Sequence, residues 1–322
     1  MRRYVLRRLA QAAGVLWAAY TVSFLVLDYL PGDPVSAMVS GGLDQAALDP
    51  AQVEQMKAEY GFDKPVLLQY LDYLGRALRG DFGDSVATGR PVRSMIGEAL
   101  PQTLQLTGAA LVLAVVCGGA LAVVATCTSW RWLRQFLLSL PPLGVSVPTF
   151  WVGLMLVQVF SFQAQVFPAF GNDGLRGLVL PALTLAIFTG AMVAQVLAKS
   201  LLVTLDEPYV QTARAKGAGR VRIHLRHALR NAALPALTVA GVMVGQLVAG
   251  AVVVETVFSR NGLGRITASA VASQDIPVVQ GVVVFGAAVY VLVNLIVDLI
   301  YPALDPRITV VGPARTRRWS LT

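Results

Sequence analysis

The sequence has few of the residues on which most enzymes depend. Among 322 residues it has two histidines and two cysteines, and only 14% of the residues are charged. It contains no His-Glu-x-x-His pattern and no His/Cys cluster, which excludes a zinc hydrolase. It also lacks the Gly-x-Ser-x-Gly elbow of serine hydrolases. We therefore predict no catalytic, cofactor-binding or metal-binding residue and do not expect an enzyme.

A phosphate-binding P-loop is absent too. The only lysine followed by serine or threonine is Lys199, before Ser200, and Ala198 stands where a P-loop requires glycine. The chain therefore cannot hydrolyse ATP by that route, and such energy has to come from a partner.

Long apolar runs are what the chain does have. It is 56% hydrophobic with a mean hydropathy of +0.64, which is too apolar for an ordinary soluble domain. Six runs approach the length of about 20 residues that crosses a bilayer. They lie at about 9–30, 103–127, 135–160, 178–198, 234–256 and 279–301. We read the first as a retained span and not a cleaved signal peptide, and Cys117 and Cys127 as apolar filler in or near the second.

The net charge of +8 reflects orientation in the membrane and not nucleic-acid binding. If the N-terminus is cytoplasmic and six spans follow, 17 of the 26 Lys and Arg residues fall in inside segments. Six of the other nine lie in the long segment 31–102, which the positive-inside rule largely discounts. The predicted fold is an all-α membrane protein of six transmembrane helices with both termini inside.

Four segments are expected along the chain. They are a tail and first helix at 1–30, an outside helical segment at 31–102, a five-helix core at 103–302 that includes the cytoplasmic segment 199–233, and a cytoplasmic tail at 303–322. Within 31–102, Asp49-Pro50 to Tyr60 and Gln69 to Leu74 predict two short helices. This segment forms a small cap and not a domain with its own large core.

The third and fifth spans are candidates for a pore. Prolines in the third span and glycines in the fifth suit either a pore lining or simple close packing of helices. The candidate pore-lining residues are Ser146, Pro148, Gly245 and Gln246. The acidic residues Asp28, Glu255 and Asp298 fall near span boundaries, where we interpret them as boundary residues paired with nearby arginines.

The cytoplasmic stretch 207–235 is the most informative segment. Pro208 suits a first helical turn, and Val210, Ala213 and Gly217 share one face that a partner's groove could cover. Beyond Gly217 and Gly219, Arg222, Arg226 and Arg230 form a basic stripe on a helix at the membrane surface that leads into the fifth span at Pro235. An ordinary basic loop and a contact with anionic lipid are the alternatives.

These motifs resemble the permease subunits of ABC importers, and most closely the B-type inner-membrane subunit of dipeptide, oligopeptide and nickel importers. The resemblance covers nearly the whole chain. It rests on Tyr209–Gly217, Arg226–Ala232 with Pro235, Pro31–Pro34, Tyr60–Pro65, Gly80–Gly83, Leu100–Leu104, Ser146–Phe150, Glu255–Phe258, Gly262–Gly264 and Asp305–Arg307. The chain departs from the family pattern at Pro208, Gln195, Gln211 and Arg260-Asn261.

The resemblance implies a type I importer permease that moves substrate without covalent chemistry. It implies a second, homologous permease, two ATPase subunits that supply ATP and magnesium, and a binding protein outside the membrane. It also implies that a coupling helix docks on the ATPase through Tyr209, Val210, Thr212, Ala213, Arg214, Ala215, Lys216 and Gly217. Peptides are the expected cargo, nickel or a metal chelate is the alternative, and a stand-alone carrier or channel is the competing class.

Overall fold

The regular structure in the described part of the chain is helical. The computed structural model describes residues 2–28 and 65–304, with side chains for 10–26 and 65–292. The elements are α1 (Arg2–Asp28), α4 (Val66–Ala77), α5 (Val92–Cys127), α6 (Arg131–Ser146), α7 (Thr149–Leu156), η1 (Val157–Gln163), α8 (Arg176–Leu205), α9 (Pro208–Ala215), α10 (Arg220–Arg222), η2 (Ile223–Ala228), α11 (Leu229–Val257), α12 (Leu263–Ala272) and α13 (Ile276–Leu304). Extended pairing among these residues is confined to one bridge between Asp84 and Pro91. The all-α prediction is confirmed.

Three described helices are long and apolar enough to cross a bilayer. They are Val92–Cys127, Arg176–Leu205 and the continuous stretch Arg220–Val257, and a bent pair of helices makes a fourth. In α1 and α13 the apolar stretches with described side chains are shorter, at Ala10–Val26 and Ile276–Leu292. The count of six spans therefore stays a prediction.

The third predicted span is not one continuous helix. The helices α6 and α7 meet at an angle of 105°. Pro148 has no N–H to donate and restricts the residue before it, and Val147 is extended, with φ −91° and ψ 130°. Pro141 and Pro142, in contrast, lie within α6.

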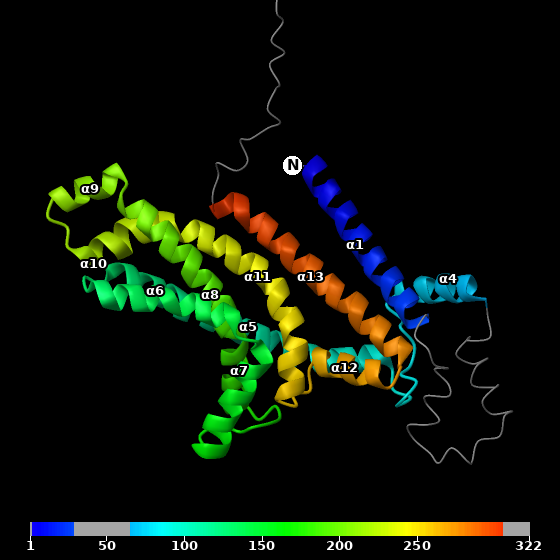
Figure 1. Ribbon diagram of the computed structural model, residues 1–322. Coiled ribbons are helices and arrows are strands. Elements are labelled where there is room, and N and C mark those ends of the chain that lie inside the picture. The colour runs from blue at the N-terminus through cyan, green and yellow to red at the C-terminus, as the bar shows by residue number, and fades with distance from the viewer. Residues whose placement is uncertain (1, 29–64, 305–322) are drawn as a thin grey trace, which may run out of the picture.

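Helix α8 is the centre of the fold, with α5 and α11 packed along it (Figure 1). In its most apolar stretch 67% of the residues are buried, against 33% for α5 and 22% for Arg220–Val257. One apolar core joins Leu106, Leu180, Leu247 and Phe258, and a second lies nearer the other end of α8, around Leu201 and Ala232. The outer faces of α5 and α11 are therefore left to lipid or to partners.

Small residues bring α5 and α8 into backbone contact. A Cβ atom on Gly118 would overlap the backbone of Gly190, and one on Gly190 would lie 3.2 Å from the carbonyl oxygen of Ala114. In a membrane, where water does not drive helices together, such close approach supplies much of the packing attraction.

Gly118→Ala is expected to lower the thermal stability of the purified chain, because the added methyl group forces α5 away from α8, at a cost of about 1–3 kcal/mol. Gly119→Ala is the matched control, since its new Cβ would lie no closer than 4.0 Å to Leu197. Equal melting temperatures for the two variants in detergent would contradict the proposed contact.

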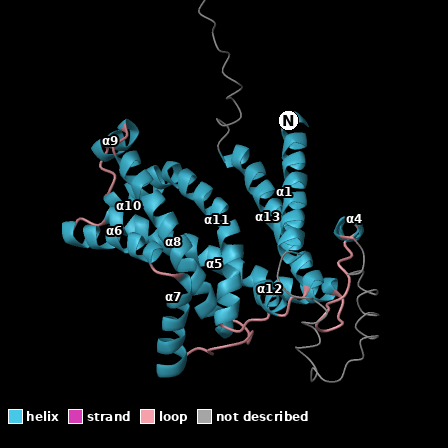
Figure 2. Cartoon of the chain, turned by 45° about the vertical axis from the view of Figure 1, so that its right-hand side comes forward, coloured by secondary structure: helices cyan, strands magenta, loops and turns pink. Residues whose placement is uncertain are grey.

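The ends of the helices fall on two sides of the molecule. The start of α1, the end of α13 and the short helix α9 lie towards one side, and α4, α12 and the end of α7 towards the other (Figures 1 and 2). The charge pattern predicts this grouping, with the first set cytoplasmic. Which side faces the cytoplasm stays a prediction.

Helix α4 confirms the short helix expected around Gln69 to Leu74. It packs on α1 through Tyr70, whose ring lies 5.7 Å from Tyr20 and 5.4 Å from Phe24. The helix expected from Asp49 to Tyr60 and the tail after residue 304 lie outside the described residues. Because α5 begins at Val92, the predicted boundary between 102 and 103 falls inside a helix.

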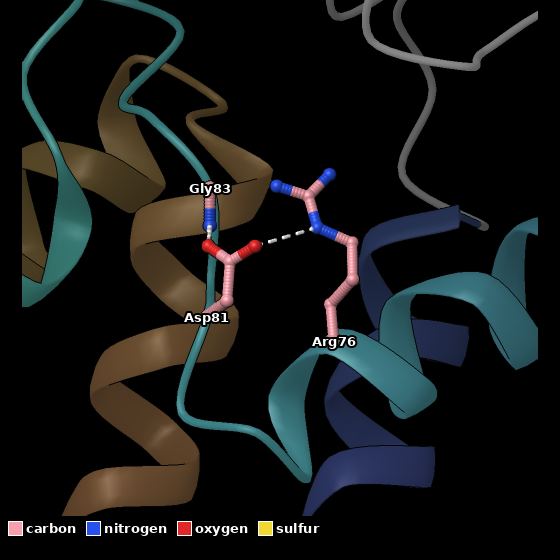
Figure 3. A network of polar contacts seen from close by, with 3 residues as sticks. All are labelled: Arg76, Asp81 and Gly83. Atoms are coloured by element: carbon pink, nitrogen blue, oxygen red, sulfur yellow. Dashed lines mark hydrogen bonds and ion pairs between the residues drawn. The ribbon is translucent and has the colours of Figure 1, made fainter.

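The turn after α4 is fixed by one carboxylate (Figure 3). Asp81 accepts a hydrogen bond of 2.9 Å from the Gly83 N–H and one of 3.0 Å from Arg76 Nε. The Gly83 N–H and then the Arg76 guanidinium hold the pKa of Asp81 below its ordinary value. Both side chains are about half exposed, so the pair sets the path of the turn more than it adds stability.

Candidate functional site

The predicted docking segment folds as a short helix of its own. Glu207 is extended ahead of α9, and Pro208 occupies its first turn, where a missing N–H costs nothing. The helix ends at Ala215, and Gly217 takes a left-handed φ of 80° that favours glycine. The predicted start and stop of this helix are confirmed.

One face of α9 is turned towards its own chain. Val210 is fully buried, and Ala213, on the same face, is partly covered. The face predicted to enter a partner's groove is therefore partly occupied. Among the predicted docking residues, those left exposed are Tyr209, Thr212, Arg214, Ala215, Lys216 and Gly217. Whether they dock on an ATPase stays a prediction.

Tyr209 ties α9 to the beginning of the next long helix. Its hydroxyl donates to the carbonyl oxygen of His227 at 3.2 Å and accepts a hydrogen bond of 3.0 Å from Asn231 Nδ2. Because Asn231 lies in α11, this bond joins α9 directly to α11. The sequence pattern included Tyr209 and Asn231 but gave no reason to pair them.

The basic stretch after α9 leads into the fifth predicted span without a break. Residues 220–257 form one continuous helix with a π-helical section at Ile223–Ala228. At its start, Arg220 Nη2 donates 2.7 Å to the carbonyl oxygen of Thr128, just after α5. The stretch is therefore attached to α5 as well as to α9.

The candidate pore residues fall in two places. Ser146 and Pro148 are exposed at the bend between α6 and α7, where Ser146 Oγ donates 2.8 Å to the carbonyl oxygen of Pro142. On α11, Gln246 is exposed, but Gly245 packs so closely that a Cβ there would overlap the ring of Tyr290 on α13. Gly245 therefore serves close packing of helices, which was the alternative to a pore lining. A pore lining by Ser146, Pro148 and Gln246 stays a prediction.

Glu255 lies near the end of α11, as the boundary position predicts, but its hydrogen bonds come from a threonine and from backbone N–H groups and not from an arginine side chain. It is fully buried at the end of α11, and its carboxylate accepts hydrogen bonds from Thr103 Oγ1 at 2.6 Å, Gly264 N–H at 2.7 Å and Arg265 N–H at 3.3 Å. The Leu263 N–H donates to the same threonine oxygen at 2.9 Å. The first N–H groups of α12 have no acceptor within the helix, and Glu255 and Thr103 supply acceptors for three of them. The cluster thereby joins α5, α11 and α12.

Two neighbouring polar groups complete this side of the fold. Arg260 is 2% exposed and donates to the carbonyl oxygens of Gly177 at 2.9 Å and Gly171 at 3.3 Å. Asp275 is 2% exposed and accepts from Ser85 Oγ at 2.6 Å and from the Val86 and Ala87 N–H groups at 3.2 Å each. Among the described residues no three His, Cys, Asp or Glu side chains gather as a metal site. These clusters hold loops in place.

Comparison with protein families gives two matches that together span most of the chain. Residues 114–310 match the family described as "Binding-protein-dependent transport system inner membrane component". Residues 1–107 match the N-terminal region of the same class of membrane component.

Named relatives align along almost their whole length. The chain is 35% identical over 308 residues to the glutathione transport system permease protein GsiC of Escherichia coli K12, covering 96% of this chain and 99% of that protein. It is also 35% identical over 316 residues, with the same coverage, to a Brucella suis protein provisionally named a peptide transport system permease protein.

Among solved structures, a chain of the inward-facing MetNI methionine ABC transporter shares the fold. The TM-score is 0.52 at 18% identity, over 65% of this chain and 96% of that one.

Proposed function

Because the chain belongs to the family of binding-protein-dependent transport system inner membrane components, we propose that it moves peptides across the membrane as one of two permeases in an ATP-driven importer. The chain is an inner-membrane permease subunit of an ABC importer and is not itself an enzyme. The peptide cargo, the partners and the docking helix are the proposed part.

The observation that carries the coupling mechanism is α9. A chain with no P-loop has a short helix between two long ones, with one side anchored by Val210 and the other exposed. We assign the exposed side, from Thr212 to Lys216, to contact with an ATPase subunit. Closure of the ATPases on ATP would push α9, and Tyr209 would pass the movement to α11 through Asn231 and His227.

The opposite side of the fold is assigned to the binding protein. A groove of about 520 Å³ lies between α12 and the turn at residues 85–90, with polar side chains such as Thr88, Arg90 and Arg265 on its walls. Hydrogen bonds to Asp275 and Glu255 fix both walls. A surface with fixed walls that carry polar side chains among apolar ones suits a partner that binds and leaves in each transport cycle.

Peptide cargo is supported by the relatives, one of which is named for glutathione and another for peptides. Nickel or a metal chelate is the alternative for this family, with cargo selected by the binding protein outside.

Transport in reconstituted vesicles tests the proposal. With the second permease, the ATPases and the binding protein present, ATP inside the vesicles is expected to drive uptake of labelled glutathione or dipeptides. Uptake in vesicles that lack the ATPases would overturn the importer mechanism. ATP-driven uptake of a nickel chelate with no peptide uptake would reject peptides as the cargo.

A further inference from the structure

An apolar groove lies open on the outer surface of the bundle. It has a volume of about 380 Å³ where α5, α8, η2 and the start of α11 meet. Every residue on its walls is valine, leucine, alanine or glycine, among them Val115, Val123, Leu197, Leu225, Leu229 and Leu237. Leu225 is 52% exposed and Leu237 is 44% exposed, so the described residues leave the groove open.

One end of the groove carries positive charge. Leu225 and Leu229 belong to the same stretch as Arg222, Arg226 and Arg230, and all three arginines are exposed. Arg226 directly follows Leu225 and Arg230 directly follows Leu229, so the arginines lie within about one helical turn of this end of the groove.

The contacts of Arg220 place this basic end at the depth of the lipid headgroups. Arg220 donates to the carbonyl oxygen of Thr128, two residues before Trp130. Trp130 and Trp132 stack with ring centroids 6.3 Å apart and are 64% and 65% exposed. Exposed tryptophans flanking an apolar helix are typical of the membrane–water interface.

The groove continues from that depth into the hydrocarbon. Its wall on α5 extends from Val123 back to Val115, which is about 12 Å along a helix. This shape matches an acyl chain that enters from the headgroup region.

We propose that the groove binds a phospholipid with an anionic headgroup, its acyl chain on the leucine and valine wall and its phosphate beside Arg222 and Arg226. Basic residues beside an apolar cleft on the cytoplasmic side attract such headgroups. A second permease is the other candidate occupant of the apolar wall, and the arginines near its end favour an anionic headgroup. An anionic phospholipid supplies an apolar chain for the groove and a negative charge for the arginines near its end.

Native mass spectrometry of the purified full-length chain tests this. With equal amounts of phosphatidylglycerol and phosphatidylcholine, we expect phosphatidylglycerol to bind about tenfold more tightly. Arg222→Gln with Arg226→Gln is expected to remove this preference while phosphatidylcholine binding persists. Arg131→Gln with Arg134→Gln, on α6 near the same interface, is the matched control and should keep it.

A second variant distinguishes the contribution of the apolar groove to lipid binding from that of the arginines. Gly119→Leu places a side chain in the groove, where a Cβ on Gly119 would have its nearest neighbour, Leu197, at 4.0 Å. We expect it to weaken binding of both lipids with unchanged helical content by circular dichroism. Equal affinity of the wild type for the two lipids, or a preference that survives the Arg222/Arg226 change, would refute the proposal. Loss of phosphatidylglycerol when the second permease is added would show that protein covers the groove.

Discussion

Ala215→Trp is expected to abolish most ATP-driven uptake while leaving the permease folded. Ala215 is the last residue of α9 and is exposed, so a larger side chain can extend away from the described part of the fold. If an ATPase groove closes over this side of α9, the indole ring holds the two surfaces apart. Loss of a central contact of that kind costs about 2 kcal/mol or more, which corresponds to a fall of more than about tenfold in affinity and coupling.

The measurement is twofold: copurification of the ATPase with the permease, and ATP-driven uptake in vesicles. Ala272→Trp is the control, because Ala272 is equally exposed but ends α12 on the opposite side of the fold. We expect the control to copurify with the ATPase as the wild type does. If Ala215→Trp copurifies with the ATPase and supports uptake as the wild type does, α9 is not the docking site.

Ala215 is a sharper test than Gly217. A side chain on Gly217 has open space around it, but its φ of 80° is strained for any other residue. A defect in a Gly217 variant would therefore mix an altered helix end with a lost contact, whereas Ala215 changes the surface alone.

Features that depend on local chemistry were predictable from the sequence. The beginning and end of α9 follow from Pro208 and Gly217, because proline presets the first turn and glycine permits the left-handed residue that ends it. The apolar runs likewise predicted α5 and α8, although the helices extend beyond the runs because polar residues continue the same backbone hydrogen bonding.

Features that depend on tertiary contacts were not predictable from the sequence. The periodicity put Val210 on the face of α9 offered to a partner, but a periodic face does not say which neighbour covers it, and Val210 packs within its own chain. Pro141, Pro142 and Pro148 look alike in sequence, yet only Pro148 separates two helices. The burial of Glu255 depends on Gly262, just before α12, because a Cβ at that position would overlap the carboxylate.

Glu255→Ala is expected to destabilise the purified permease by about 3–5 kcal/mol. It removes the acceptor of Thr103 Oγ1 and of the Gly264 and Arg265 N–H groups in a fully buried position. Each buried donor left without a partner costs about 1–3 kcal/mol, and the lost side chain also leaves a cavity. The measurement is the apparent melting temperature in detergent.

Two further variants decide whether hydrogen bonding is the cause. Glu255→Gln keeps one acceptor oxygen but turns an NH₂ group towards the same donors, so it should fall between the wild type and Glu255→Ala. Glu98→Gln is the matched control: Glu98 accepts 2.6 Å from Arg90 with its side chain 61% exposed, and such a pair is worth less than about 1 kcal/mol. If Glu255→Ala melts no lower than Glu98→Gln, the carboxylate is not what holds α12 against α5 and α11.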